Sequence, residues 1–306
     1  MEEIKKGFKA GFVAVAGRPN VGKSTLVNAL LHQKVAAVSP RPQTTRRNQL
    51  GILTNKESQI IFVDTPGLHT PRHKLGEFMN QEAFEAVVDA DLVLWLLDCN
   101  VPFTDEDKAI GERLKAAPKL PPVVILLTKI DLVKSSDQPA LAAKALEMFP
   151  AESILPVSAY SRQGLEKLQD MIIGYLPDGH LYYDEDQVTN LYERDIAADL
   201  IREAALQNLE DEIPHGIAVR IDEYTERGDT GAFIQATMFV ERESHKGIVI
   251  GQGGSMLKKI GSAARTGIEE MSGRKVFLEI RVKVNKNWRD SQDGLKSFGY
   301  FRENEA

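Results

Sequence analysis

The apolar residues in the first half of the chain form short continuous runs instead of alternating with polar residues. Such runs are found at residues 12–16, 59–63, 91–97, 122–127 and 154–157. Helical spacing of apolar residues is found between or after these runs, at 25–33, 77–88, 104–116 and 164–175. Strands that are apolar on both faces and separated by helices are typical of a mostly parallel sheet with helices on both sides. The pattern predicts a doubly wound α/β domain.

The second half of the chain has a different pattern. In residues 276–284 one face of the expected strand is apolar (Val276, Leu278, Ile280, Val282 and Val284) and the other carries Glu279, Arg281 and Lys283, which predicts a strand with one face on a core. Further strands are expected at 216–224, 232–241 and, more briefly, 248–250, with helices at 190–209 and 255–271. This mixture predicts a smaller α+β domain. Turn residues from Pro177 to His180 separate the two patterns, so we expect a first domain at 1–178, a linker at 179–189 and a second domain at 190–306.

Composition and charge narrow the class of protein. A single cysteine among 306 residues excludes a disulfide framework and a cysteine-built zinc site. The start of the chain is not a signal peptide, and no apolar run approaches the ~20 residues of a membrane span, so we expect a cytoplasmic protein. The net charge is −6, yet residues 242–289 carry 11 basic and 4 acidic side chains. That segment indicates a face for a polyanion, with an ordinary solvated surface as the alternative.

The segment from Gly17 to Ser24, Gly-Arg-Pro-Asn-Val-Gly-Lys-Ser, matches the phosphate-loop motif G-x-x-x-x-G-K-[ST] between an expected strand and an expected helix. Backbone N–H groups of such a loop surround phosphate oxygens at a helix N-terminus. Lys23 can reach the β- and γ-phosphates, and the Ser24 hydroxyl can ligate Mg²⁺. A tight structural turn is the alternative reading. The residues expected to contact nucleotide here are Gly17, Arg18, Pro19, Asn20, Val21, Gly22, Lys23, Ser24 and Thr25.

Three further segments follow predicted strands and point to a guanine nucleotide. Asp64-Thr65-Pro66-Gly67 offers a carboxylate that can hold Mg²⁺ through a water, and a Gly67 N–H that can sense the γ-phosphate. Thr128-Lys129-Ile-Asp131 offers the Asp131 carboxylate to the N1–H and exocyclic amine of guanine, with the Lys129 stem over the base. Ser158-Ala159-Tyr160 offers the Ala159 N–H to the guanine oxygen. We therefore expect Asp64, Thr65, Pro66, Gly67, Thr128, Lys129, Asp131, Ser158, Ala159 and Tyr160 in the nucleotide site.

With four motifs in this order, the chain resembles the translation-factor class of GTPases and, within it, the Era family, over essentially its whole length. Pro42-Gln-Thr-Thr-Arg46 looks like the family's second motif, and the resemblance implies that Thr45 closes over Mg²⁺ when GTP is bound. One residue departs from the pattern. Thr128 stands where the family usually has Asn, which puts in doubt the contacts that an amide would make to the phosphate loop.

The sequence predicts slow intrinsic hydrolysis. Ras-like enzymes place a water-orienting Gln after the third-motif glycine, whereas this chain has Leu68 there. The family resemblance implies another device, in which Asn20 helps to hold K⁺ near the transferring phosphate. The alternative is that Asn20 only tightens the loop by hydrogen bonds. The residues expected to take part in hydrolysis are Lys23, Thr45, Gly67 and Asn20.

Gly251-Gln252-Gly253-Gly254 is a G-x-x-G sequence ahead of the helix 255–271, with Lys246, Lys258, Lys259 and Arg265 nearby. The segment resembles a type II KH domain, whose G-x-x-G loop admits a single-stranded RNA backbone. A structural glycine-rich helix start is the alternative. The residues expected to bind RNA are Lys246, Ile248, Ile250, Gly251, Gln252, Gly253, Gly254, Lys258, Lys259 and Arg265, with Ile248, Ile250, Leu257 and Ile260 as an apolar floor for bases.

The resemblance as a whole implies a Mg²⁺-dependent GTPase switch that binds the 3′ end of 16S ribosomal RNA and assists assembly of the 30S subunit. It also implies a peripheral contact with the inner face of the cell membrane. Two rival functions stay open on the residues alone. One is an ATPase, and the other is a binding protein in which nucleotide is a structural ligand and the second domain contacts protein or membrane.

Overall fold

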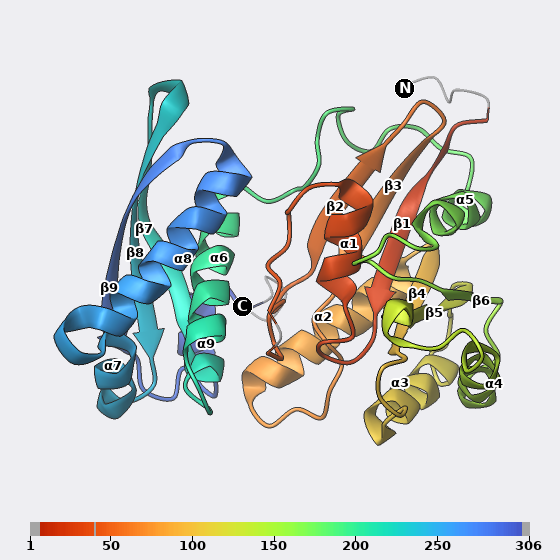
Figure 1. The fold of residues 1–306 in the computed structure, drawn as a ribbon, viewed down its shortest axis with the longest axis horizontal. Helices are drawn as coiled ribbons and strands as arrows, with labels where there is room; N and C mark the ends of the chain where they lie inside the picture. Colours follow the sequence, from red (N-terminus) through yellow and green to blue (C-terminus); the bar gives the residue numbers. More distant parts are fainter. Residues whose placement is uncertain (1–6, 40, 302–306) are drawn as a thin grey trace. The chain divides into compact units, whose positions relative to one another are not determined.

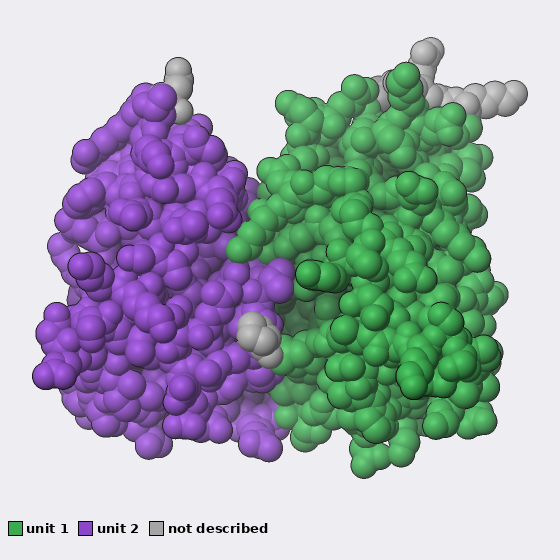
Figure 2. All heavy atoms as spheres, in the orientation of Figure 1, with its two compact units in different colours: residues 1–36, 45–70, 79–190 green, residues 37–44, 71–78, 191–306 purple. Residues whose placement is uncertain are grey.

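The computed structural model describes residues 7–39 and 41–301 and divides into two compact units (Figure 2). The N-terminal unit comprises residues 1–36, 45–70 and 79–190, and the C-terminal unit comprises 37–44, 71–78 and 191–306. The sequence pattern led us to expect two contiguous domains. In the structure, two loops of the first half cluster with the C-terminal unit. The expected absence of a signal peptide falls on residues 1–6, which lie outside the described residues.

The N-terminal unit is a six-stranded sheet in the order β2-β3-β1-β4-β5-β6 (Figure 1). All neighbours pair in parallel except β2 and β3, which are antiparallel. The strands are β1 (Lys9–Ala16), β2 (Gln49–Thr54), β3 (Ser58–Asp64), β4 (Leu92–Asp98), β5 (Val123–Thr128) and β6 (Ser153–Pro156). The helices are α1 (Lys23–Leu31), α2 (Lys74–Asp89), α3 (Asp105–Lys115), α4 (Gln138–Met148) and α5 (Leu165–Tyr175). The predicted mostly parallel, doubly wound sheet is confirmed.

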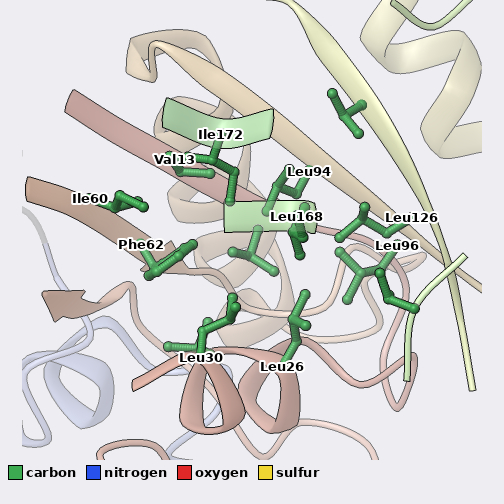
Figure 3. Packing of buried hydrophobic residues seen from close by; sticks show 14 of the residues in the cluster. Val13, Leu26, Leu30, Ile60, Phe62, Leu94, Leu96, Leu126, Leu168 and Ile172 are labelled. Atoms are coloured by element: carbon green, nitrogen blue, oxygen red, sulfur yellow. The ribbon is translucent and has the colours of Figure 1, made fainter. Parts of the chain in front are cut away.

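Each face of this sheet has its own apolar core. On one face, side chains of the central strands pack against Leu26 and Leu30 of α1 and against Leu168 and Ile172 of α5 (Figure 3). On the other face, alternate residues of the same strands, including Trp95, pack against α2, α3 and α4. Because β3, β4 and β5 are buried along their whole length, they bring the loops that follow them to one edge of the sheet in fixed positions.

The C-terminal unit is a three-stranded sheet in the order β7-β8-β9, antiparallel between β7 and β8 and parallel between β8 and β9. Helices α6 and α8 share its apolar core (Figure 1). The elements are α6 (Glu193–Asn208), β7 (Ala218–Arg227), β8 (Gly231–Val240), α7 (Glu243–Ile250), α8 (Ser255–Ser272), β9 (Lys275–Val284) and α9 (Gln292–Ser297). Short 3-10 turns lie at Ile130–Leu132, Pro214–Gly216, Gly228–Thr230 and Gln252–Gly254.

One predicted element of this unit is wrong. Residues 248–250 were expected to form a strand, but they are the last residues of helix α7. Val249 is buried while Ile248 is half exposed, a pattern of three residues that fits a helix and a strand equally well. The helix begins at Glu243, where an acidic side chain in the first turn stabilises the positive end of the helix dipole.

The lengths and compositions of the described helices show whether any of them could cross a membrane. Within residues 7–39 and 41–301, none of them combines the length and the apolarity that a membrane crossing requires.

Candidate functional site

The loop between β1 and α1 is built to surround an anion. Gly17 has a φ of 148°, and a Cβ there would lie 2.8 Å from the carbonyl oxygen of Leu96. Gly22 has a φ of 104°, and Asn20 between them is also left-handed, with a φ of 64°. Such turns aim successive N–H groups toward one centre in front of the first turn of α1. The predicted phosphate loop therefore has the backbone geometry of a phosphate cradle.

Lys23 is the buried cation at the end of this loop. Its side chain is buried, and its Nζ donates to the carbonyl oxygens of Gly17 at 3.1 Å and Arg18 at 3.0 Å. Burial lowers the pKa of Lys23 to about 8; the Asp64 carboxylate acts against this shift and the Arg18 guanidinium adds to it. A phosphate group beside the amine would favour its charged form, so the side chain is suited to bind one.

The three residues predicted to hold Mg²⁺ meet at one point. The Ser24 hydroxyl donates to Oδ2 of Asp64 at 2.6 Å and lies 2.9 Å from the Thr45 hydroxyl. Thr45 Oγ1 donates to the same carboxylate oxygen at 3.2 Å, and both Thr45 and Asp64 are buried. Two hydroxyls and a carboxylate are the oxygen donors that Mg²⁺ prefers. The donor set therefore fits Mg²⁺, which would compensate the buried negative charge of Asp64.

Gly67 and Leu68 lie against the phosphate loop. A Cβ on Gly67 would come within 2.7 Å of the Pro19 nitrogen, so this close approach requires glycine. The Leu68 N–H donates to the carbonyl oxygen of Gly17 at 3.1 Å, and its side chain is buried in the core shared with α2 and α3. A buried apolar side chain at this position cannot orient a water molecule.

A cavity of about 370 Å³ adjoins the phosphate loop and has the lining expected of a guanine pocket. Both segments predicted to bind the base contribute to it, one through Asp131 and the other through Ser158 to Tyr160. Leu132, which the sequence analysis did not single out, lines it as well and is largely exposed. The lining is Val21, Gly22, Thr25, Leu26, Thr128, Lys129, Asp131, Leu132, Val157, Ser158, Ala159 and Tyr160. Phosphate-loop and base-recognition residues thus share one cavity.

Thr128, which stands where the family usually has Asn, does contact the phosphate loop. Its hydroxyl lies 2.9 Å from the carbonyl oxygen of Val21, in the phosphate loop, and 3.1 Å from that of Leu97. Because a hydroxyl has one proton, the two carbonyls share a single donor, whereas an amide would offer two. Thr128 therefore keeps a contact with the phosphate loop with one donor fewer.

Sequence reasoning missed a charged network that supports the loop. The Lys129 Nζ binds Oδ2 of Asp98 at 2.7 Å and donates to the carbonyl oxygen of Asn20 at 3.1 Å. Arg18 pairs with the same Asp98 oxygen at 3.7 Å and with buried Asp107 of α3 at 3.3 Å. Asp107 also closes the capping box with Thr104. The capping box is readable in the sequence, but nothing there connects it to Arg18.

Two side chains that were predicted to bind nucleotide form hydrogen bonds with the protein backbone. The Thr65 hydroxyl is buried and donates to the carbonyl oxygen of Val15 at 2.8 Å, which fixes the start of the third motif on β1. The Ser158 hydroxyl accepts a hydrogen bond from the Ser161 N–H at 3.0 Å and shapes the loop that carries Ala159. These two hydroxyls therefore fix the backbone of the third-motif loop and of the loop that carries Ala159.

The C-terminal unit carries a second candidate site. A groove of about 450 Å³ lies between the start of α8 and strand β9. Gly251, Gly253 and Gly254 all have positive φ in the loop before α8, which suits glycine and lets the loop turn tightly. The groove is lined by Gly254, Leu257, Lys258, Gly261, Ser262 and Arg265 on one side and by Val276, Phe277, Leu278 and Ile280 on the other.

The expected apolar floor of this groove is wrong in part. Leu257 lines the groove, whereas Ile260 is fully buried in the core, and Ile248 and Ile250 belong to α7. The floor comes instead from β9, where Phe277 is 61 % exposed. Of the basic residues predicted to bind RNA, Lys258 and Arg265 line the groove, and Lys246 and Lys259 lie on the flanking helices.

Comparison with known proteins agrees with both sites. Residues 12–129 match the family described as 50S ribosome-binding GTPase, and residues 212–289 match the KH domain. The fold and the nucleotide site define a P-loop GTPase that is followed by a KH domain. The relatives named GTPase Era from Ruminiclostridium cellulolyticum and Clostridium perfringens are 44% and 45% identical to it, each over 96% of this chain and 98% of the relative. The chain belongs to the GTPase Era family.

Two solved structures are similar to this chain over nearly its whole length. One is Era in complex with MgGDPNP and nucleotides 1506–1542 of 16S ribosomal RNA, with a TM-score of 0.91. The other is a variant of Aquifex aeolicus Era bound to GDP and AlF4⁻, with a TM-score of 0.90. Each is 36% identical to this chain and covers 96% of it and 100% of the solved chain.

Proposed function

We propose that this GTPase binds GTP with Mg²⁺ and uses the nucleotide state to control its hold on single-stranded RNA at the 3′ end of 16S ribosomal RNA, in assembly of the 30S subunit. The observation that carries the first part is the meeting of Ser24, Thr45 and Asp64 within 3.2 Å of one another. The RNA partner is supported by the groove on α8 and β9 and by the Era complex with a 16S RNA segment.

The chain's own residues account for most of the chemistry. Lys23 and the N–H groups of the phosphate loop bind and orient the phosphates, and their charge stabilises the transferring group. Bound Mg²⁺ supplies further neutralisation of developing negative charge. Thr45 joins this centre only when its loop closes, so its contact with Ser24 and Asp64 distinguishes GTP from GDP. Gly67, which packs closely on Pro19 of the phosphate loop, would offer its N–H as a second contact that depends on the γ-phosphate.

Intrinsic hydrolysis is slow and stimulated by K⁺ in this proposal, because Leu68 leaves no side chain to orient water. Asn20 is exposed and left-handed at the tip of the phosphate loop, a position from which an amide oxygen can reach a cation beside the phosphates. Hydrolysis rates in KCl and NaCl test this. Asn20→Asp should abolish the difference between the salts, and equal rates for the unaltered protein would refute the K⁺ role.

RNA binding rests on a groove that combines donors, charge and apolar surface. The loop before α8 exposes backbone to a phosphate, Lys258 and Arg265 add positive charge, and Phe277 offers an aromatic face for a base. The test is the affinity for an oligonucleotide of the 16S 3′ end, measured with GDP and with a non-hydrolysable GTP analogue. Identical affinities in the two states would leave two independent modules.

Variants of the groove sharpen that experiment. Lys258→Ala with Arg265→Ala should weaken RNA binding and reduce its salt dependence, because fewer counterions are released. Lys286→Ala provides a matched control, since Lys286 is an exposed lysine of the same unit that does not line the groove. Crosslinking that falls outside the groove would contradict the assignment.

A cytoplasmic location with a peripheral membrane contact completes the proposal. The excess of basic residues at 242–289 supports binding to anionic lipid head groups as well as to RNA. Flotation with vesicles of phosphatidylserine and phosphatidylcholine tests it, and a lack of binding to the anionic vesicles at low salt would rule the membrane contact out.

A further inference from the structure

The segment 37–44, which leads directly into Thr45, belongs to the C-terminal unit. Within that unit it is attached to helix α6 near both of its ends. Residues 38, 43 and 44 use main-chain atoms for these attachments. The contacts therefore depend on the path of the backbone rather than on the side chains of the loop.

Arg202 holds the end of the segment that is next to Thr45. Its Nη1 donates to the carbonyl oxygen of Gln43 at 3.0 Å, and its Nη2 donates to that of Thr44. The side chain is only 3 % exposed, and its Nη2 also donates to Oδ1 of Asp199 at 2.7 Å. A planar fork of two donors matches two successive carbonyls in a way that a lysine amine cannot.

Glu203 and Gln207 hold the other end. The Glu203 carboxylate accepts a hydrogen bond from the Val38 N–H at 3.2 Å, and the Gln207 amide donates to the carbonyl oxygen of Val38 at 3.4 Å. Glu203 and Gln207 also bind each other at 3.0 Å. One helix thus presents three polar side chains to the backbone of one loop: the adjacent Arg202 and Glu203 and, one turn further on, Gln207.

The loop adopts a demanding conformation where Arg202 binds it. Gln43 has a φ of 65°, a left-handed conformation that residues with a side chain seldom adopt without support. Arg202 supplies that support at the carbonyl of the same residue. The next residue but one is Thr45, whose hydroxyl lies 2.9 Å from Ser24. The residues that Arg202 binds thus lie directly ahead, in the sequence, of a residue that contacts the expected magnesium ligands.

The opposite side of α6 belongs to the core of the RNA-binding unit. Ile201 and Ala205 are buried there with Ile260 and Ala264 of α8, the helix that begins at the G-x-x-G loop. If bound RNA displaced α8, direct packing would transmit the movement to α6. If the loop at 37–44 moved, Arg202 would transmit that movement to α6 as well.

We propose that Arg202 is a positioning residue of the GTPase, by which the RNA-binding unit holds the loop at 37–44 in the form that lets Thr45 close. The inference rests on the proposed function, because it assigns a role to Thr45 that only GTP engages. Without Arg202 the end of the loop next to Thr45 loses its attachment to α6, and the nucleotide must supply more of the order there. The affinity for GTP then falls, while that for GDP, which does not engage Thr45, stays the same.

The test compares nucleotide affinities of Arg202→Lys with those of the unaltered protein. The ratio of the affinity for a non-hydrolysable GTP analogue to that for GDP, with Mg²⁺ present, should fall about tenfold, since one charged hydrogen bond is lost. Arg194→Lys is the matched control: Arg194 lies on the same helix and also donates to a carbonyl, but to that of Ile221 in β7. A purely structural arginine would lower thermal stability and leave the ratio unchanged, and that result would overturn the proposal.

A second variant keeps the proposal testable if Arg202→Lys fails to fold. Gln207 is exposed, so Gln207→Ala removes one contact with the loop at little risk to the core. It should lower the same ratio in the same direction but by less, about threefold. An unchanged ratio in a folded Gln207→Ala protein, together with an unchanged single-turnover rate, would refute the anchoring of the loop by α6.

Failure of the proposed function would look different. If the unaltered protein bound the 16S oligonucleotide equally with GDP and with the GTP analogue, the coupling to RNA would be refuted, whereas a lowered nucleotide ratio in Arg202→Lys would still support the positioning role. If both the RNA coupling and the nucleotide ratio responded in Arg202→Lys and neither in Arg194→Lys, both proposals would be supported.

Discussion

The hydroxyl of Thr128 lies 2.9 Å from the carbonyl oxygen of Val21, which ties the end of β5 to the phosphate loop. This contact replaces the one expected of an Asn at the same place in the family. Since Asp131 lies in the 3-10 turn that follows β5, the hydrogen bond fixes the residues predicted to bind the base relative to the predicted phosphate loop within one unit.

Removing only this hydroxyl should weaken binding of both GDP and GTP. Thr128→Val keeps the shape and leaves the Val21 carbonyl without this donor, at a cost of about 1–3 kcal/mol, which corresponds to about 5- to 150-fold in affinity. Thr128→Asn restores an amide and should bind at least as well as the unaltered protein. Titration calorimetry with GDP measures both. Full affinity in Thr128→Val would show that the contact is dispensable.

Asp131→Asn should change which base the protein prefers. In the proposed site the carboxylate would accept two hydrogen bonds from guanine, and an amide would present a donor to one of them. We expect the affinity for GDP to fall by about 100-fold or more, and that for xanthosine diphosphate, which carries a carbonyl in place of the amine, to rise. Competition among GDP, XDP and ADP for one site measures the preference. Retained preference for GDP would remove Asp131 from base recognition, and stronger binding of ADP by the unaltered protein would favour an ATPase.

The affinity for nucleotide should fall as the pH rises above about 8. Burial lowers the pKa of Lys23 to about 8, and phosphate groups beside the amine raise it, so above that pH binding takes up a proton. The logarithm of the association constant then declines with a slope that approaches −1 per pH unit. Calorimetry with GDP between about pH 7 and 9 measures the slope. Lys23→Arg stays charged throughout and should lack this decline, whereas a decline of equal size in that variant would assign it to another group.

Gly67→Ala should impair the GTP state in particular. A Cβ at this position would lie 2.7 Å from the Pro19 nitrogen, so the third motif must move away from the phosphate loop. We expect affinity for a GTP analogue and single-turnover hydrolysis to fall at least tenfold while GDP binding stays within about threefold. Gly174→Ala is the control, because a Cβ in that helical position meets nothing within 4 Å and should raise stability by about 0.5–1 kcal/mol. Equal loss of GDP and GTP binding would indicate general disruption of the loop.

The strongest sequence signals marked the elements that the core requires. Residues of β3, β4 and β5 are buried on both faces, so their apolar runs were unmistakable, and the motifs that follow them were fixed in place with them. Strand β2 gave no such signal because it lies at the edge of the sheet and is only partly buried. Helix α4 was missed because only Ala145 on it is buried, which leaves little apolar periodicity to detect.

The site residues were predictable where a motif specifies backbone geometry, and unpredictable where partners are distant in the chain. Lys23, Ser24 and Asp131 follow from local patterns. The pairing of Arg18 with Asp107 spans 89 positions, and that of Gln43 with Arg202 spans 159. Charged residues in an amphipathic helix carry no local mark of such a partner, so only the folded structure identifies them.

The attachment of residues 37–44 to α6 has a consequence for synthesis on the ribosome. During translation, the predicted phosphate-binding and base-binding loops are made well before Arg202. The segment ahead of Thr45 therefore has no contact with Arg202 until about two thirds of the chain has been made. If α6 anchors this loop as proposed, a nascent chain would gain its full preference for GTP only after α6 has been made and has folded with its sheet.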